Sequence, residues 1–256
     1  MQSSKLRIGI ISAEKSGDYL AASFIESLKS SGRDFELFGI GGKELDKFNI
    51  SRPQDFDREI LNVMGIIDPL KNLRQILRAR KQILDFLISK NINIFIGVDS
   101  PDLNSFFHKK LKKINSTINF QIVSPSVWAW RSGRVKQLRK FVDTTFCLFK
   151  FEHEYLKKNN VNSFHVGHPF QDIEKVEDVS SIKNRYGINN DSECLTFLVG
   201  SRRSEISNML SIYKKVIKKV YESDKSYSFL FPVVNQDHKN IIQAELSELE
   251  TPIFIQ

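Results

Sequence analysis

Residues 94–104 read IFIGVDSPDLN, an apolar run that ends in an acid and a helix start. Continuous Ile, Phe and Val over 94–98 predict a strand buried on both faces, as in a parallel sheet. Ser100 and Pro101 then supply an N-cap followed by proline at the first helical position. Asp99 is left at the carboxyl end of the strand, where open α/β sheets bind their ligands. It is therefore a candidate catalytic carboxylate, and a loop or capping acid is the alternative.

Strands and helices alternate on both sides of this stretch, which predicts an α/β fold with two Rossmann-like domains. We expect an N-terminal domain over 1–169, an interdomain connection over the polar residues 170–192, and a second domain over 193–256. The predicted strands are 6–11, 35–40, 94–98, 119–123, 144–149, 163–166, 194–199, 227–233 and 253 onward, and the predicted helices are 17–30, 70–90, 151–158, 204–221, 236–249 and one that begins at Pro101. Three strands and two helices cannot cover a doubly wound sheet, so we expect the second domain to be incomplete.

The composition is typical of a folded globular protein, with 41% hydrophobic and 27% charged residues among 256. A formal charge of +8 favours anionic partners, namely nucleic acid, phosphorylated substrates or an acidic membrane surface. No apolar run approaches the roughly 20 residues of a membrane span and no signal peptide is recognised, so we expect a cytoplasmic protein. Cys147, Cys194 and His168 lack metal-ligand spacing, and the cysteines are expected to be small core residues.

Two turns that follow strands could hold anions. The turn 12–18 places Glu14, Ser16 and Gly17 at a helix start, where free backbone N–H groups attract negative charge. It is neither a GxGxxG nor a P-loop, so dinucleotide binding loses its best marker, and a plain βα turn remains the alternative. The glycine-rich stretch 39–42 is a weaker case, either a phosphate-sized turn or a tight connection.

A basic stripe marks the predicted helix 70–90. Lys71, Arg74, Arg78 and Lys81 recur at helical spacing beside the apolar face, and the preceding segment holds Val63, Met64, Ile66 and Ile67. A basic amphipathic helix next to an apolar segment suits an anionic membrane surface. A solvated helix face over an ordinary core is the alternative.

Both tryptophans of the chain lie at the end of the strand 119–123, in the stretch SPSVWAWR at 124–131. Basic residues follow them without an intervening acid. Such a group could stack on bases or sugars, or line an acyl and phosphate pocket, whereas two core tryptophans are the alternative. No recognised nucleic-acid motif accompanies the charge. In the second domain, Gly200-Ser201-Arg202 at a strand-to-helix turn would suit a phosphate, with a surface arginine as the alternative.

Read together, these motifs resemble the lipid-A-disaccharide synthase family of inverting GT-B glycosyltransferases. The most specific is SPSVWAWR at 124–131, and four further stretches agree in the same order: VMG at 63–65, GVDSPD at 97–102, GHP at 167–169 and PVVN at 232–235. The resemblance runs from about Leu6 to the end. It implies a GT-B architecture with a complete first Rossmann-like domain and the first part of a second one.

The resemblance also implies the reaction, which is transfer of 2,3-diacylglucosamine from its UDP conjugate to the 6-hydroxyl of 2,3-diacylglucosamine 1-phosphate. Asp99 would be the general base and Arg202 would stabilise the diphosphate leaving group. Glu14, Ser16, Gly17, Ser126 and Trp128 are the further candidates for substrate contact. The family needs no metal or cofactor and works at the cytoplasmic face of the inner membrane, which favours the membrane interpretation of 63–81.

Three alternatives stay open. The chain could be another GT-B enzyme such as a UDP-sugar 2-epimerase, which would not need a basic apolar helix. It could be a non-catalytic membrane-associated fragment or one half of a two-chain enzyme. Nucleic-acid binding is third and is not expected. Because GT-B enzymes hold the nucleotide sugar mostly in the second domain, we expect this polypeptide alone to have little or no transferase activity; a homo-oligomer of the full-length protein remains open.

Overall fold

The computed structural model describes residues 5–54, 56, 73–172, 178–201 and 203–256. The chain divides into two compact units, Met1–Ile173 and Glu174–Gln256, and each has a parallel sheet and a hydrophobic core of its own. The predicted α/β class is therefore confirmed.

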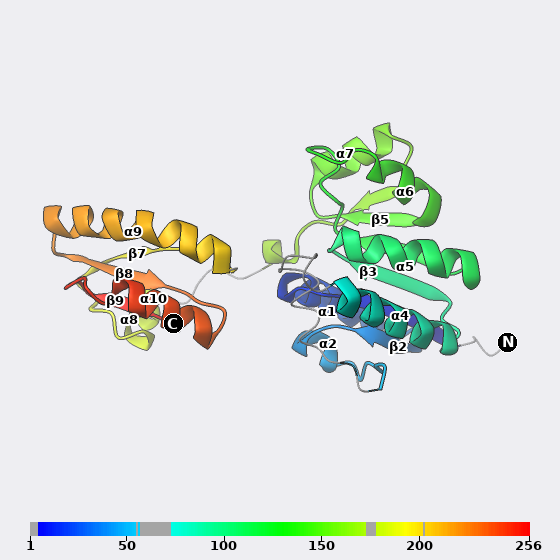
Figure 1. Ribbon diagram of the computed structural model, residues 1–256, viewed down its shortest axis with the longest axis horizontal. Coiled ribbons are helices and arrows are strands. Elements are labelled where there is room, and N and C mark those ends of the chain that lie inside the picture. The colour runs from blue at the N-terminus through cyan, green and yellow to red at the C-terminus, as the bar shows by residue number, and fades with distance from the viewer. Residues whose placement is uncertain (1–4, 55, 57–72, 173–177, 202) are drawn as a thin grey trace. The chain divides into compact units, whose positions relative to one another are not determined.

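The first unit is built on a six-stranded parallel sheet in the order β2-β1-β3-β4-β5-β6 (Figure 1). Its strands are β1 (Leu6–Ser12), β2 (Phe35–Ile40), β3 (Ile94–Val98), β4 (Ile118–Ile122), β5 (Thr144–Cys147) and β6 (Ser163–His165). Its helices are α1 (Lys15–Ser30), α2 (Lys43–Asp46), α4 (Leu73–Ser89), α5 (Pro101–Ile114), α6 (Arg134–Phe141) and α7 (Lys150–Lys158), with a 3-10 turn at Pro169–Asp172.

The strand order reverses at β1. The chain goes from β1 outward to β2 and then returns to place β3 on the opposite side of β1, where Ser12 pairs with Val98. Such a switch point leaves a crevice beyond the carboxyl ends of the two strands, and open α/β sheets bind ligands there. The fold thus brings the turn after Ser12 next to Asp99.

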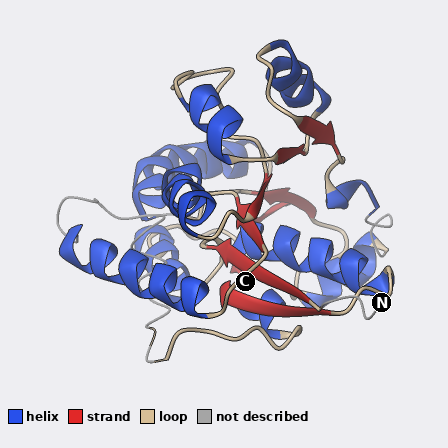
Figure 2. Cartoon of the chain, turned by 90° about the vertical axis from the view of Figure 1, so that its right-hand side faces the viewer, coloured by secondary structure: helices blue, strands red, loops and turns tan. Residues whose placement is uncertain are grey.

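Alternating side chains of each buried strand feed two cores, one on each face of the sheet. Ile8, Ile10, Ile96 and Val98 pack against α1, whereas Ile11 and Phe95 pack against α4 and α5. Figure 2 shows helices on both sides of the strands. Because helices cover both faces of the sheet, consecutive side chains of these strands are apolar, which explains the continuous apolar runs in the sequence.

The second unit contains the three-stranded parallel sheet β7-β8-β9. Its elements are α8 (Val179–Arg185), β7 (Glu193–Thr196), α9 (Arg203–Ser223), β8 (Tyr227–Phe231), α10 (Gln236–Leu246) and β9 (Ile253–Ile255). Phe229 and Phe231 are fully buried in its core, together with Ile206 of α9 and Ile242 of α10.

The structure differs from the predicted elements in three helices. The segment 170–192, predicted as a connection, contains α8, and α2 and α6 were not predicted. α2 and α8 have only four and seven residues, too few to show a helical period, and α6 is so rich in Lys and Arg that its two buried residues, Val135 and Leu138, gave a weak pattern. Most other boundaries shift by one to three residues, as frayed ends allow.

Candidate active site

Asp99 lies at the switch point, beside the start of α1. A Cβ built on Gly17 would lie 3.6 Å from the Cβ of Asp99 and 2.9 Å from the Oγ of Ser12. The side chain of Asp99 is half-buried, and none of the described residues donates a hydrogen bond to its carboxylate or pairs with it. The structure therefore brings together two of the predicted site residues, Gly17 and Asp99, and leaves the carboxylate available to a substrate.

The backbone around Asp99 is held in an uncommon conformation. Asp99, Ser100 and Val123 have positive φ values of 50°, 40° and 71°, in the left-handed region that L residues avoid. For a β-branched residue such as Val123 this conformation is a clear outlier. Strained residues of this kind cluster at functional sites when the surrounding structure over-determines them.

Two buried amide side chains hold this strained backbone. The Nδ2 of Asn104 donates to the carbonyl oxygens of Asp99 at 2.8 Å and Val98 at 3.2 Å. The Nε2 of Gln121 lies within hydrogen-bonding distance of three carbonyls, those of Asp99 at 3.2 Å, Ile122 at 3.0 Å and Val123 at 3.3 Å. Because both amides are nearly inaccessible to water, their contacts with the backbone are worth more than exposed ones.

His108 completes this network. Its Nε2 lies 3.0 Å from the Oε1 of Gln121. The Gln121 amide nitrogen donates to backbone carbonyls, so Oε1 is the acceptor and the imidazole donates this bond. Burial lowers the pKa of His108 to about 4, so the ring is neutral at pH 7. Gly97 makes room for this packing, because a Cβ there would come within 2.9 Å of the Asn104 and His108 side chains.

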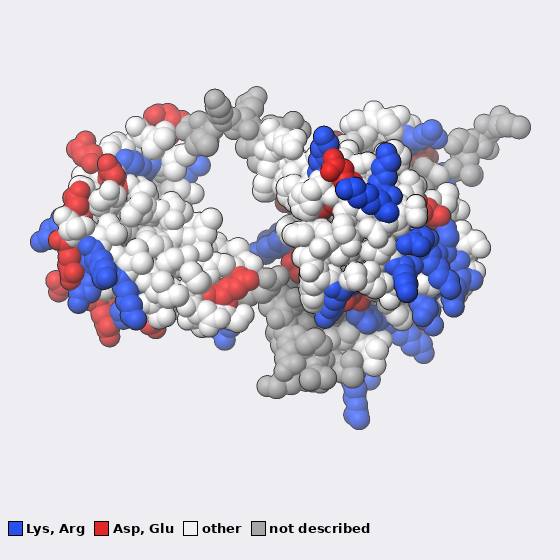
Figure 3. All heavy atoms as spheres, turned by 90° about the horizontal axis from the view of Figure 1, so that it is seen from above, with Lys and Arg blue, Asp and Glu red and all other residues white. Residues whose placement is uncertain are grey.

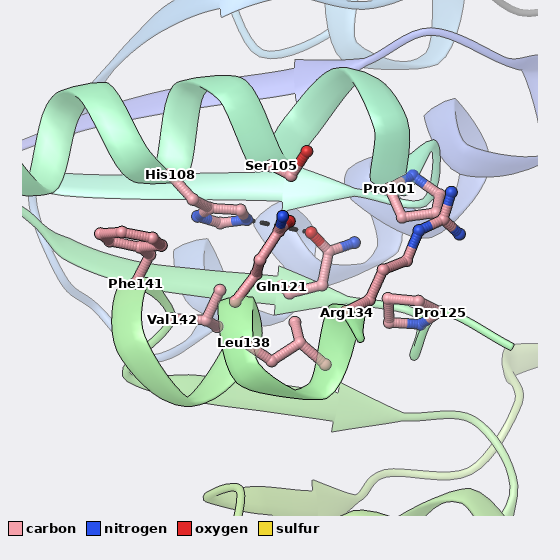
Figure 4. A pocket seen from close by; sticks show the side chains of 10 residues that line it. Pro101, Ser105, His108, Gln121, Pro125, Arg134, Leu138, Phe141 and Val142 are labelled. Carbon is pink, nitrogen blue, oxygen red and sulfur yellow. Dashed lines mark hydrogen bonds between the residues drawn. The ribbon is translucent and has the colours of Figure 1, made fainter. Parts of the chain in front are cut away.

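A small pocket opens beside the network, between α5 and α6 (Figure 4). Its lining includes His108, Gln121 and Arg134, and its cavity volume is about 20 Å³, room for a single water molecule. The pocket is therefore too small for a sugar.

The turn after β1 leads directly into α1, whose first turn contains one buried acid, Asp18. Glu14 is the N-cap residue of α1 in extended conformation, and Ser16 is exposed on the first turn. Asp18 is buried and accepts hydrogen bonds from the backbone N–H groups of Gly42 at 2.7 Å and Glu44 at 2.8 Å. The glycine-rich stretch 39–42 is thus a tight connection, because the protein's own carboxylate occupies the position that an anion would take.

Exposed aromatic rings run along the carboxyl edge of the sheet. Trp128 meets Phe151 edge-on at 5.1 Å between ring centroids, and Phe149 stacks on Phe151 at 5.8 Å. The row continues with further ring contacts through His168 and Phe170 to Tyr19 on α1. Trp128 and Trp130 are 48% and 55% exposed, so the alternative of two core tryptophans is wrong. We name this row (Tyr19, Phe149, Phe151, Trp128, His168 and Phe170) the aromatic ledge.

Ser126 is also exposed, and its backbone carbonyl accepts from the N–H groups of Ala129 and Trp130 in the turn that carries the tryptophans. Asp102 lies in the first turn of α5, where an acid complements the helix dipole, and it also forms ion pairs with Arg131 and Arg134. The carboxylate therefore has a second role that the helix pattern did not reveal.

The structure describes part of the surface that was predicted to contact a membrane. On α4, Arg74, Arg78 and Lys81 are exposed, and Leu77 between them is 52% exposed. Val63, Met64, Ile66 and Lys71 lie outside the described residues. Among the helices in the described parts of the chain, none is long and apolar enough to cross a bilayer.

Arg202, the predicted partner of the diphosphate, also lies outside the described residues. The turn that leads to it is shaped by Gly200, whose φ is +99°, and by Glu205, whose carboxylate accepts from the N–H of Ser201 at 2.9 Å. Val199 before it is buried in the core of the second unit.

Burial raises the pKa of the Cys147 thiol to about 12, as expected of a core residue.

The motifs did not point to Asn104, His108 or Gln121. A signal was present for two of them: Asn104 and His108 are four residues apart on the apolar face formed by Leu103, Phe107 and Leu111. Polar residues on a buried helix face need partners, and the strands that supply these partners are known only from the fold.

A model of a known protein family matches almost the whole chain. The family model described as Lipid-A-disaccharide synthetase matches residues 8–254. The chain belongs to this family. A lipid-A-disaccharide synthase of Acinetobacter baylyi is 33% identical over 243 residues, which are 93% of this chain and 60% of that protein. The synthase of Hydrogenovibrio crunogenus is 35% identical over 239 residues, 93% of this chain and 63% of the relative. The chain thus spans less than two thirds of these synthases.

Solved structures share the fold at low sequence identity. The S. aureus MnaA-UDP co-structure has a TM-score of 0.66 and 11% identity over 98% of this chain and 68% of its own. A UDP-GlcNAc 2-epimerase from Neisseria meningitidis bound to UDP-GlcNAc gives 0.63 and 12% over 98% and 71%. A glycosyltransferase from Rickettsia africae gives 0.54 and 14% over 99% and 68%. These likenesses confirm the predicted GT-B fold and, at this identity, nothing beyond it.

Proposed function

We propose that this member of the lipid-A-disaccharide synthase family serves the transfer of 2,3-diacylglucosamine from its UDP conjugate to 2,3-diacylglucosamine 1-phosphate. The first unit would hold the acceptor and supply the base. The observation that carries the proposal is the half-buried carboxylate of Asp99, unpaired among the described residues, at the β1–β3 switch point.

Asp99 would take the proton from the 6-hydroxyl of the acceptor as that oxygen bonds to the anomeric carbon of the donor. The bond from the anomeric carbon to the diphosphate breaks in the same step, UDP leaves, and attack from the opposite face inverts the anomeric centre to β. An alcohol is a weak nucleophile at pH 7, so a carboxylate within hydrogen-bond reach accelerates the step by roughly 10²–10⁴-fold. The amides of Asn104 and Gln121 would hold the backbone of Asp99 and so position its carboxylate.

Developing negative charge on the leaving diphosphate needs a cation, and Arg202 is proposed for that role because a guanidinium pairs with two phosphate oxygens at once. The turn with Glu14, Ser16 and Gly17 is proposed to contact substrate, since Gly17 adjoins Asp99. Two structural neighbours are bound to UDP or to UDP-GlcNAc, which supports a UDP-sugar as donor.

Both substrates carry acyl chains, and the first unit offers apolar surface for them. The aromatic ledge, which includes Trp128, presents exposed rings along the sheet edge that also bears Asp99. Arg74, Arg78 and Lys81 are proposed to hold the protein at the anionic inner-membrane surface, where each cation contributes about 1 kcal/mol. The protein would then meet its lipids at that surface.

The test uses a chimera that joins residues 1–256 to the part of the Acinetobacter baylyi synthase that this chain does not cover. With both lipid substrates, Asp99→Asn should lower UDP release by at least 100-fold, while the matched control Asp85→Asn, on the exposed face of α4, should leave it unchanged. Full turnover of Asp99→Asn would refute the role of the base. The 256-residue chain by itself should release little or no UDP.

The same chimera separates this function from that of an epimerase. UDP-GlcNAc should not be converted to its 2-epimer, and disaccharide should form only when the acylated acceptor is present. Epimerisation without transfer would replace the proposal.

A further inference from the structure

Three arginines converge on Asp102 at the start of α5, two on its carboxylate and one on its backbone carbonyl. The Nη1 of Arg131 lies 3.0 Å and 3.2 Å from the two carboxylate oxygens of Asp102, and Arg134 donates to the Oδ1 of the same residue. Arg80, on α4, donates to the backbone carbonyl of Asp102 at 3.2 Å. The cluster thus ties α4, α5 and the loop after β4 to one point, three residues beyond Asp99.

Asp102 balances only part of this charge. Three guanidinium groups and one carboxylate leave a local charge of +2, and each guanidinium has five N–H donors. The bonds to Asp102 use one terminal nitrogen of each arginine, and the buried Nε of Arg80 has no hydrogen-bond partner. Burial also lowers the pKa of Arg80, an effect that the nearby Asp102 partly offsets. A further anion could accept from the terminal N–H donors of these arginines that Asp102 leaves unused.

The loop that carries Arg131 is strained and exposed. Arg131 has a φ of +53°, and its guanidinium lies 4.4 Å from the ring centroid of Trp130, while that of Arg134 lies 5.5 Å from the same ring. Trp130 is itself 55% exposed. Stacking on the indole orients both guanidiniums and sets a large apolar surface directly beside the positive charge.

We propose that Arg80, Arg131 and Arg134 form a site for a phosphate monoester on an amphiphile, with Trp130 against its apolar part. A phosphate monoester carries about −1.5 to −2 charges at pH 7, which matches the local charge of +2, whereas a phosphodiester carries only one. Its three terminal oxygens suit the forked donors of arginine. In the proposed transferase the ligand would be the phosphate of the acceptor sugar, so this inference rests on the proposed function.

The exposed basic face of α4 and the arginine cluster should differ in how selectively they bind anions. Lys and Arg side chains crowd over part of the first unit (Figure 3), and such scattered cations attract any anionic surface. The arginine cluster is built around one fixed carboxylate and one indole, and should distinguish phosphate monoesters from other anions. The experiment therefore compares lipids that differ in the phosphate and not in surface charge.

Binding of the 256-residue chain is measured by co-sedimentation with phosphatidylcholine vesicles that contain either phosphatidic acid, a monoester, or phosphatidylglycerol, a diester, adjusted to equal surface charge. We expect tighter binding to phosphatidic acid, and competition by glucose 1-phosphate, which has no acyl chain. Arg131→Gln with Arg134→Gln should weaken binding to phosphatidic acid by about tenfold or more, because charge-assisted hydrogen bonds are lost. Lys136→Gln, an exposed cation on α6, is the control and should have a much smaller effect.

A second pair of variants keeps the charge. Arg131→Lys with Arg134→Lys should still bind phosphatidylglycerol but lose most of the preference for phosphatidic acid, because lysine cannot form the fork. Equal binding of both lipids by the unaltered protein, or an unchanged preference in the lysine variants, would overturn the site. Preferential capture of a single-stranded oligonucleotide by the same arginines, without competition from glucose 1-phosphate, would overturn it as well.

These outcomes are separate from those of the transferase test. If the protein shows no preference for the phosphate monoester while the chimera still transfers the sugar in an Asp99-dependent way, the site is refuted and the proposed function is not. Monoester binding in a chimera that transfers no sugar would refute the function alone.

Discussion

The side-chain amide of Asn104 donates a 2.8 Å hydrogen bond to the backbone carbonyl of Asp99. The same nitrogen reaches the carbonyl of Val98, so one buried side chain on the first turn of α5 fixes the two residues at which β3 ends. The candidate base is therefore held through its backbone, and its carboxylate is left free among the described residues.

Replacing Asn104 by alanine should lower the free energy of unfolding of the first unit by about 1–3 kcal/mol, because two buried carbonyls lose a donor. Urea unfolding followed by tryptophan fluorescence measures this, since both tryptophans lie in the first unit. Asn240→Ala, on the exposed side of α10, should have no such effect. In the chimera, the variant should lower kcat more than it raises KM; equal changes would show a purely structural role.

Gly97→Ala should destabilise the first unit by roughly 1–3 kcal/mol, because the new methyl group would overlap the side chains of Asn104 and His108. Gly133→Ala is the matched control: no atom lies within 4 Å of a Cβ there, and its φ of −57° suits alanine. It should be neutral or stabilising by about 0.4–1 kcal/mol. Equal stability of the two variants in urea would show that α5 can move away from β3 without cost.

The stability of the first unit should depend on pH through His108. Its folded pKa is about 4, below its ordinary value of 6.5, so between these values the unfolded chain binds a proton that the folded chain does not. The contribution of the neutral imidazole is complete above pH 6.5 and is lost as pH falls toward 4, by about 3 kcal/mol in all. Comparing urea unfolding at pH 7 and pH 4.5 should show this loss in the wild type.

His108→Gln should remove that part of the pH dependence, since a glutamine amide can still donate to Gln121 and does not titrate. Asn240→Ala, which alters an exposed residue that does not titrate, should keep the wild-type slope. An unchanged slope in His108→Gln would assign the pH dependence to other groups.

Changing Arg74, Arg78 and Lys81 to Gln should weaken binding to vesicles of phosphatidylcholine and phosphatidylglycerol by at least tenfold, because three cations of about 1 kcal/mol each are removed. The effect should shrink as salt rises. Three exposed lysines of the second unit, Lys215, Lys219 and Lys225, form a control of equal charge. Equal losses in both triple variants would indicate attraction by net charge alone.

The sequence was sufficient for the parts of the fold in which burial repeats along the chain. The apolar runs at 6–11 and 94–98 predicted central strands because side chains on both faces of the sheet are buried. It missed α2 and α8 because four or seven residues do not complete a hydrophobic period. Asp99 could be selected from its place at a strand end, whereas Gly17 became its neighbour only through the pairing of β1 with β3.

By itself, the sequence determined the order of elements, the family and the candidate base, since these depend on local patterns and on motifs read in order. Only the tertiary structure decided which groups surround that base. Asn104 and Gln121 come from different elements, and Arg80 lies 51 residues before Arg131 in the sequence. Such groups meet because parallel strands bring their carboxyl ends to one edge, a long-range consequence of sheet order that no local pattern contains.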